Sequence, residues 1–210
     1  MICTQSRFRP EGTLLALGVV RQVRQNELIY REGDPASHFM QMVGGVARMT
    51  SVRRDGSRFI DAFHLSGDVF GMEVGTLYAN SAEAVGACSL VAYPAHDRVL
   101  LDAISEGFAC QIVTALMHDL RQAKEHARLV AQASALEKTS AFLIDWSSRT
   151  ERFPLITLPM TRQDIADYLG LSGETLCRCL AQLHRERLIE MLSPRRFKLL
   201  DAPALRKMAA

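Results

Sequence analysis

The stretch MTRQDIADYLGLSGETLCRCLAQLHRERLIE, residues 160–190, contains two helix-start signals separated by a tight turn. Thr161, followed three residues later by Asp164, is a variant of the capping box that opens a helix. Gly170 can adopt the left-handed conformation that ends this helix, and Ser172 can cap the next one. This spacing predicts a helix-turn-helix, the motif that places its second helix in the major groove of DNA.

The second of these helices has an apolar and a polar side. At about 100° per residue, Leu176, Cys179 or Leu180, and Leu183 fall on one side and are expected to pack inward. Arginine binds O6 and N7 of guanine in a bidentate manner, and glutamate accepts from the N4 amine of cytosine. We therefore expect base contacts from the outer side, made by Gly173, Glu174, Cys177 and Arg178. Glu174 and Arg178 can also form an i,i+4 pair, which is compatible because the pair would orient the arginine.

Hydrogen-bond donors around this motif suit the phosphate backbone, which positions a protein on DNA without specifying sequence. The expected backbone contacts are Arg162, Gln163, Ser172, Thr175, Arg195 and Arg196. The last two lie in a predicted hairpin, residues 188–191 and 196–200 joined through Ser193-Pro194-Arg195, that would act as a wing. The net charge is only +2, but residues 178–198 hold six arginines and lysines against two glutamates. Such a basic cluster favours phosphate contact, and a solvated helix face is the alternative.

Residues 20–95 are expected to form short strands separated by turn signals, which favours an antiparallel β-sandwich or barrel. The clearest hairpin surrounds Asp55-Gly56, with partly alternating apolar residues on both sides. The last strand is expected to begin at Tyr93 and end at Pro94. The predicted fold class is α+β, because helices follow this β domain.

The hydrophobic period changes near Ile104, where a long helix begins. Its apolar seam recurs at three- and four-residue steps, at Ile112, Leu116, Leu120, Ala123, Ala127 and Val130. Because the helix is long for one β domain to cover, we expect these residues to pair with a symmetry mate in a homodimer. The alternative is a helix that packs only on its own β domain. The predicted domains are residues 1–106, 107–134 and 135–210, with a hinge at 132–135.

The pattern DIADYLGL followed by ET and R, within residues 164–178, resembles the DNA-binding domain of the Crp/Fnr superfamily and is most similar to its Fnr and FixK branches. Residues 27–93 resemble the cyclic-nucleotide-binding-like β-roll of that superfamily, and residues 107–132 resemble its dimer helix. The resemblance implies a β-roll, a long dimerisation helix and a C-terminal winged helix-turn-helix. It also implies a homodimeric transcription activator that works with RNA polymerase on a palindrome resembling TTGAT-N4-ATCAA, read by Glu174 and Arg178.

Cyclic AMP, one effector of the superfamily, requires a Gly-Glu for the ribose and an arginine for the phosphate. Here Met72 separates Gly71 from Glu73, and the stretch where an Arg-Ser pair should fall reads Asn80-Ser81. Without a guanidinium group the buried phosphate charge would lack compensation. Cyclic-nucleotide sensing is therefore not expected.

Two other effectors depend on metal ligands. An iron–sulfur cluster needs four thiolates, and the N-terminal segment offers only Cys3. Members of the FixK branch likewise lack the cluster cysteines and the cyclic-AMP residues, and they need no cofactor. The resemblance therefore implies a regulator that is active without a small-molecule effector. The alternative is a ligand-gated regulator of the same fold, which binds a nucleotide, or a haem through His64 or His96.

Cys177 is a redox candidate. It lies on the predicted outer side next to Arg178, where electropositive surroundings and access raise the reactivity of a thiol. Oxidation to sulfinic or sulfonic acid would place negative charge against phosphates and bases and so inhibit DNA binding. The alternative is a small neutral residue that contacts a base methyl group. Cys179 lies about 200° further around the helix, so the two sulfurs do not form a chelating pair.

Composition narrows the class of protein further. The apolar runs are far shorter than the ~20 residues of a membrane span, the first residues lack the apolar core of a signal peptide, and the five cysteines are unevenly spaced. We therefore expect a cytoplasmic protein without membrane contact. A cupin-like metalloenzyme would need clustered ligands. Neither an enzyme nor a metal site is expected, because no HxH or HxxH spacing occurs among His38, His64, His96, His118, His126 and His184.

Overall fold

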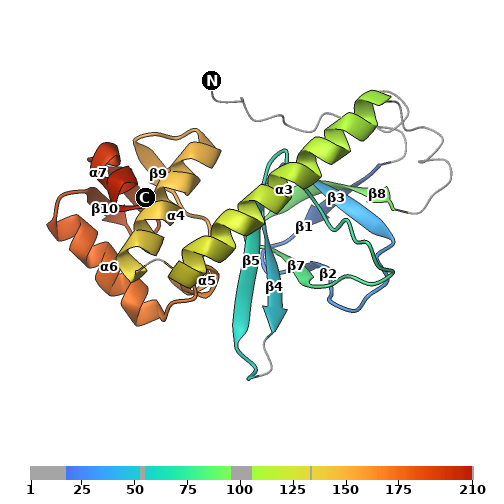
Figure 1. Ribbon diagram of the computed structural model, residues 1–210. Coiled ribbons are helices and arrows are strands. Elements are labelled where there is room, and N and C mark those ends of the chain that lie inside the picture. The colour runs from blue at the N-terminus through green and yellow to red at the C-terminus, as the bar shows by residue number, and fades with distance from the viewer. Residues whose placement is uncertain (1–17, 53–54, 96–105, 133, 210) are drawn as a thin grey trace. The chain divides into compact units, whose positions relative to one another are not determined.

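The computed structural model describes residues 18–52, 55–95, 106–132 and 134–209 (Figure 1). Contacts divide the chain into two compact units, Met1–Ala123 and Lys124–Ala210, here called the first and the second unit. The division lies inside the long helix α3 (Glu106–Gln132), whose last turns therefore belong to the second unit. The predicted domain boundaries stay a prediction, although α3 does end and α4 (Ala135–Thr150) does begin where the hinge is expected.

The first unit consists of two antiparallel four-stranded sheets that share one core. Their strand orders are β1-β8-β3-β6 and β2-β7-β4-β5. Because successive side chains of a strand point to opposite faces, each sheet turns alternate apolar residues, such as Leu90 and Met49, into one common cluster. This confirms the predicted antiparallel β domain. The strands are β1 (Val19–Val23), β2 (Leu28–Tyr30), β3 (His38–Gly44), β4 (Val46–Val52), β5 (Arg58–Leu65), β6 (Val69–Phe70), β7 (Ser81–Ala84) and β8 (Cys88–Pro94).

The hairpin around Asp55-Gly56 forms as predicted. Strands β4 and β5 pair antiparallel, from Val46 opposite Leu65 to Val52 opposite Arg58. Asp55 Oδ1 accepts hydrogen bonds from the backbone N–H of Ser57 at 2.9 Å and from its hydroxyl at 2.6 Å. Gly56 has a φ of +81°, which a residue with a side chain rarely adopts. Asp55 and Gly56 thus supply the two features that this turn requires.

The predicted start of the last strand is wrong. Strand β8 begins at Cys88 and turns Cys88, Leu90 and Ala92 into the core, whereas Tyr93 lies near its end. Serine and alanine give a weak strand signal in sequence. The strand forms because it pairs with β1 on one side and with β3 on the other.

Helix α3 has one side against the first unit and one exposed apolar side. Ile112 and Ala115 pack against a cluster that contains Phe39 and Tyr93. Ile112, although predicted on the dimer seam, thus contacts the chain's own sheets. The exposed side, here called the apolar stripe, consists of Val113, Leu116, Met117 and Leu120. Neither α3 nor any other helix among the described residues is long and apolar enough to cross a membrane.

The second unit packs helices against a small antiparallel sheet with the order β10-β11-β9. Trp146 of α4, Leu176 of α6 and Phe197 of β11 are almost completely buried in its core. This unit confirms the predicted helix-turn-helix and the C-terminal hairpin. Besides α4, its elements are β9 (Leu155–Thr157), α5 (Arg162–Leu169), α6 (Gly173–Arg185), β10 (Ile189–Ser193), β11 (Arg196–Leu199) and α7 (Ala202–Met208).

Helix α7 is absent from the sequence prediction, which ended in the hairpin. Asp201 caps this helix by accepting a hydrogen bond from the backbone N–H of Ala204 at 2.9 Å. Pro203 stands in the first turn, where its missing N–H costs nothing. Leu205 is completely buried and anchors the helix. The Asp-Ala-Pro start signal was present in the sequence.

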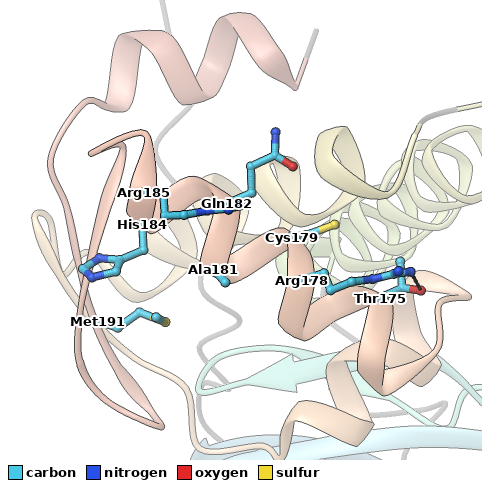
Figure 2. Close-up of a pocket in the computed structure, with 8 residues that line it drawn as sticks. All are labelled: Thr175, Arg178, Cys179, Ala181, Gln182, His184, Arg185 and Met191. Carbon is cyan, nitrogen blue, oxygen red and sulfur yellow. Dashed lines mark hydrogen bonds between the residues drawn. The ribbon is translucent and has the colours of Figure 1, made fainter.

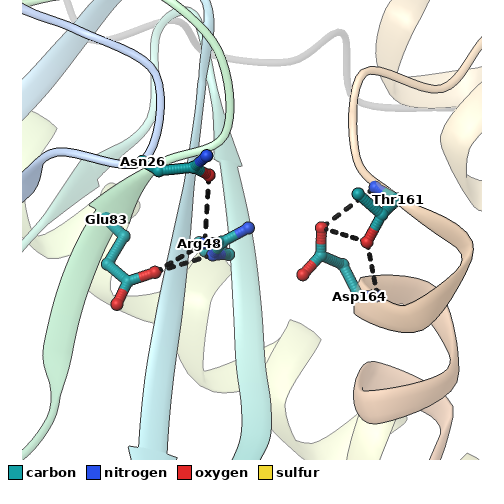
Figure 3. A network of polar contacts seen from close by, with 5 residues as sticks. All are labelled: Asn26, Arg48, Glu83, Thr161 and Asp164. Atoms are coloured by element: carbon teal, nitrogen blue, oxygen red, sulfur yellow. Dashed lines mark hydrogen bonds and ion pairs between the residues drawn. The ribbon is translucent and has the colours of Figure 1, made fainter.

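A buried ion pair joins two strands of the first unit (Figure 3). Arg48 of β4 donates from Nε and Nη2 to Glu83 Oε2 at 2.9 and 2.7 Å. Its Nη2 also donates to Asn26 Oδ1 at 3.3 Å. Removal of the glutamate would take an ion pair from a buried guanidinium group, so the pair constrains how β4 and β7 align.

Candidate nucleic-acid interface

The capping signals of the helix-turn-helix form as predicted. Thr161 donates from its backbone N–H and its hydroxyl to Asp164 Oδ2 at 2.9 and 2.8 Å, and Asp164 N–H donates back to the hydroxyl (Figure 3). Gly170 ends α5 with a φ of 62°, and Ser172 caps α6 by accepting from Thr175 N–H. These local bonds satisfy the N–H groups that a helix start leaves unpaired.

The inner side of α6 is buried as predicted. Leu176 and Leu183 are completely buried, and Cys179 and Leu180 are buried beside them. This packing fixes the rotation of α6 about its own axis. The opposite side of the helix, with Glu174 and Arg178 in its first turns, must therefore face outward.

Glu174 and Arg178 are the most exposed charged pair at the start of α6. Their side chains are 82% and 71% exposed, and Arg178 Nη1 lies 4.0 Å from Glu174 Oε1. Arg178 Nη2 also donates to Thr175 Oγ1 at 3.4 Å. The expected i,i+4 pair is thus present, and it leaves the guanidinium edge and the carboxylate accessible to a base edge.

Gly173 lies where α5 and α6 come close. A Cβ at this position would lie 3.0 Å from Oε1 of Gln163, which itself donates from Nε2 to Asp167 Oδ1 at 2.6 Å. A glycine therefore lets the start of α6 approach α5. The predicted base contact of Gly173 and the predicted backbone contact of Gln163 stay predictions.

Arg162 and Cys177 meet between α5 and α6. Both side chains are half-buried, and Arg162 Nη1 donates to Cys177 Sγ at 3.4 Å. From the sequence, Arg162 is expected to contact the DNA backbone and Cys177 the base edges. The structure brings them together, and the phosphate contact of Arg162 stays a prediction.

A hollow extends from the outer side of α6 to the wing (Figure 2). Figure 2 shows Arg178, Ala181 and Arg185 along α6, with Met191 of β10 beside them. Of the residues that line it, Thr175 and Arg178 were predicted to contact DNA, whereas the others, Gln182, His184 and Met191 among them, were not. The period of α6 places Gln182 and His184 beside its outer side, but Met191 belongs to another element and gave no signal. The lining residues are Thr175, Arg178, Cys179, Ala181, Gln182, His184, Arg185 and Met191.

The predicted wing is present as the hairpin of β10 and β11. Arg195 and Arg196 stand exposed at its turn, and Lys198 is exposed on β11. Together with Arg178, which pairs with Glu174, and Arg185 they give the second unit a basic surface. Such a surface suits the phosphates on either side of a groove.

Gly71 and Glu73, at the positions where a cyclic nucleotide would be bound, make contacts within the first unit. Glu73 Oε1 accepts a hydrogen bond from the backbone N–H of Ala79 at 3.2 Å. Gly71 has a φ of +77°, and a Cβ there would lie 3.1 Å from the ring of Tyr30. The buried Tyr30 ring stacks on Tyr78 with 3.7 Å between the ring centroids. These aromatic rings occupy the interior next to Glu73.

The haem candidate His64 is buried in β5. Its ring stacks on Phe70 with 4.9 Å between the centroids, and its Nδ1 lies 3.9 Å from Asp68 Oδ2. The other candidates, His96 and Cys3, lie outside the described residues. Within the part of the chain that the structure describes, no group of three or more His, Cys, Asp or Glu side chains could hold a metal ion.

Comparisons with known proteins agree with this architecture. A Crp-like helix-turn-helix domain matches residues 137–208, and a cyclic nucleotide-binding domain matches residues 20–101. The nitrogen fixation regulation protein FixK of Azorhizobium caulinodans is 36% identical over 99% of this chain and 86% of that protein. The transcriptional activatory protein AadR of Rhodopseudomonas palustris is 33% identical over 84% of this chain and 78% of that protein.

A solved structure shows the same fold. The structure of FixK2 from Bradyrhizobium japonicum superposes with a TM-score of 0.86 at 33% identity and covers 92% of this chain and 98% of that one. These relatives are transcription regulators and not enzymes. The chain therefore belongs to the Crp/Fnr family of DNA-binding transcription regulators, with a cyclic-nucleotide-binding-like β-roll, a long helix and a winged helix-turn-helix, and it is similar to FixK proteins.

Proposed function

We propose that this chain is a homodimeric transcription activator that binds a TTGAT-N4-ATCAA palindrome without a small-molecule effector. The observation that carries the proposal is the exposed Glu174–Arg178 pair at the start of a helix whose rotation is fixed by burial. Arg178 reads the guanine of each half-site and Glu174 accepts from the cytosine paired with it. Regulators of this family bind DNA and act as dimers, which fits one recognition helix for each half-site.

The interior of the β-roll supports independence from an effector. Glu73, which would hold a ribose, already accepts a hydrogen bond from Ala79 N–H, and Tyr30 and Tyr78 are stacked next to it. No arginine stands at Asn80-Ser81 to compensate a phosphate. A cyclic nucleotide bound there would bury a phosphate charge without compensation.

The names of the relatives support the activator role. The protein from Rhodopseudomonas palustris is named a transcriptional activatory protein, and two thirds of this chain or more align with it and with the FixK proteins. An activator of this kind contacts RNA polymerase after binding its palindrome. The β-roll then acts mainly as a scaffold for dimerisation.

One observation favours the alternative, a ligand-gated regulator of the same fold. Asn80 Oδ1 is buried and has no hydrogen-bond partner among the described residues. A polar ligand in the β-roll, such as a nucleotide, would satisfy this oxygen.

A gel shift on the palindrome tests the proposal. The purified apo protein is expected to bind the palindrome at nanomolar concentrations at moderate salt, with an affinity that falls linearly with salt on logarithmic axes. A scrambled duplex is the control. Addition of cyclic nucleotides, and spectra of the protein as purified, distinguish the alternative: binding that requires a nucleotide, or a haem absorbance band, would contradict effector independence.

Oxidation of Cys177 is proposed to inhibit DNA binding. Two successive reactions with hydrogen peroxide convert the thiol to sulfenic and then sulfinic acid and release one water each. The acid would add a negative charge beside Arg162 and Arg178, on the side that faces DNA. Peroxide is expected to lower the operator affinity of the wild type more than tenfold, about the cost of one charge-assisted bond, but not that of Cys177→Ala.

The matched control for this prediction is Cys110→Ala. Cys110 is exposed on α3, outside the helix-turn-helix, so Cys110→Ala is expected to keep the sensitivity of the wild type to peroxide. Operator affinity is measured by fluorescence anisotropy before and after peroxide. An equal loss of operator affinity in the wild type and in Cys177→Ala would contradict the redox role. Cys177 would then be a small neutral residue that contacts a base methyl group.

A further inference from the structure

The last turns of α3 are attached to the helix-turn-helix by a histidine. The ring of His126 is stacked on Tyr168 of α5, with 4.0 Å between centroids and planes within 2°. His126 Nε2 lies 2.7 Å from the backbone oxygen of Tyr168, and because a carbonyl only accepts, the nitrogen donates. Tyr168 is in the last turn of α5, where carbonyls lack helical partners. One side chain thus both packs on α5 and completes its C-terminus.

Other contacts surround this joint within the second unit. Tyr168 also packs against Phe142 of α4, at 5.9 Å and 59°. Val130 Cγ1 would lie 3.3 Å from a Cβ built on Gly170, so Val130 covers the turn between α5 and α6. The buried Lys138 donates from Nζ to the backbone oxygen of Val130 at 2.8 Å. Helices α3, α4 and α5 therefore meet around Tyr168.

Tyr168, on which the His126 ring is stacked, is itself largely buried. Burial, reinforced by the negative charge of Asp145, raises the pKa of Tyr168 to about 12. The phenol is therefore neutral at physiological pH and packs as an aromatic ring. The stack and the His126 hydrogen bond, together with Val130 over Gly170, are contacts between α5 and the end of α3.

We propose that His126 is a positioning residue for operator recognition, which holds α5 and α6 at one fixed direction to the end of α3. The inference rests on the proposed function, a homodimer on a palindrome. In such a dimer the distance between the two recognition helices must match the distance between half-sites. The proposed positioning acts through α3, the helix that also carries the apolar stripe. Without His126, the second unit would keep its fold but hold α6 less firmly relative to α3.

The test is a series of palindromes with two to six base pairs between the half-sites, together with a duplex that holds a single half-site. The wild type is expected to prefer one spacing sharply. His126→Ala is expected to bind the palindrome of the preferred spacing about tenfold more weakly, because it loses one hydrogen bond and one ring stack. It should lose little on the other spacings and nothing on the single half-site. Variants with a merely lowered stability would lose affinity on every duplex alike.

Conservative variants separate the two contacts of His126. His126→Gln keeps an N–H donor and His126→Phe keeps a ring. The affinity of both variants for the preferred palindrome is therefore expected to lie between that of the wild type and that of His126→Ala. Tyr168→Phe keeps the ring and the carbonyl and should keep the wild-type spacing profile. His118→Ala is the matched control, because His118 lies on the same helix and contacts Gln122 there.

The outcomes distinguish this inference from the proposed function. A sharp wild-type profile that His126→Ala leaves unchanged, or lowers uniformly, overturns the positioning role alone. A wild type that binds every palindrome no more tightly than the single half-site overturns the proposed function and this inference with it. A flattened profile in His126→Ala with partial rescue by His126→Phe and His126→Gln supports the positioning role.

Discussion

Replacement of both Glu174 and Arg178 by alanine is expected to remove most of the discrimination between the palindrome and a scrambled duplex. Each good base contact contributes about 1–3 kcal/mol of discrimination. A dimer makes four such contacts, so even at the lower value the loss is about 4 kcal/mol, or about 10³-fold in the ratio of affinities. The affinity for the scrambled duplex should change little, because phosphate contacts supply it.

The same double variant is expected to fold normally. Both side chains are largely exposed, and their 4.0 Å pair is worth only a few tenths of a kcal/mol. The thermal midpoint, followed by circular dichroism, should therefore match that of the wild type. Arg206→Ala is the matched control, since Arg206 is an exposed arginine on α7 of the same unit.

Single variants test the two contacts separately. Arg178→Ala and Glu174→Ala should each relax the preference at the same position, the single G·C pair of TTGAT, because the guanine and the cytosine belong to one base pair. Competition gel shifts with singly substituted operators measure both. A folded double variant that still separated cognate from scrambled duplexes would falsify the base-reading role.

Local signals explain why the helix-turn-helix was predictable. Thr161, Asp164, Gly170 and Ser172 act on their own or neighbouring backbone groups, so their effect depends on spacing alone. The rotation of α6 followed from its apolar period in the same way. The Asp55-Gly56 turn belongs to this class, because its bonds are made within three residues.

Contacts between distant segments explain what the sequence could not predict. The start of β8 depends on pairing with β1 and β3, which are far away in the chain. Three further features each join two elements. They are the hydrogen bond from Arg162 to Cys177, the stack of His126 on Tyr168, and the position of Met191 in the hollow. Periodicity describes one element at a time and cannot predict such pairs.

The apolar side of α3 contains both residues whose place followed from the sequence period and residues whose place depends on tertiary contacts. The period correctly predicted an apolar side, and Leu116 and Leu120 are exposed on it. Ile112 has the same period, yet it packs on the chain's own sheets, and Val130 packs on the turn at Gly170. A residue at the edge of an apolar side can serve either surface, and only the tertiary structure decides which.

The second large effect is expected from the apolar stripe of α3. Leu116 and Leu120 are 45% and 49% exposed, and Val113 and Met117 are more exposed still. At about 100° per residue these four side chains fall within roughly 100° of one another, the width of a helix-pairing face. We expect Leu116→Asp combined with Leu120→Asp to convert the dimer to a monomer in sedimentation velocity, because a dimer would bury four aspartates in its interface.

Loss of the dimer is expected to lower the affinity for the palindrome by about 10³-fold, since two linked half-site contacts bind at an effective concentration near millimolar. The affinity for a single half-site should stay unchanged, because α5, α6 and the wing lie in the second unit. Leu77→Asp is the matched control: Leu77 is 53% exposed in the first unit but lies outside α3. If the double aspartate variant sedimented as a dimer and bound the palindrome like the wild type, the stripe would have to face something other than a second copy of the chain.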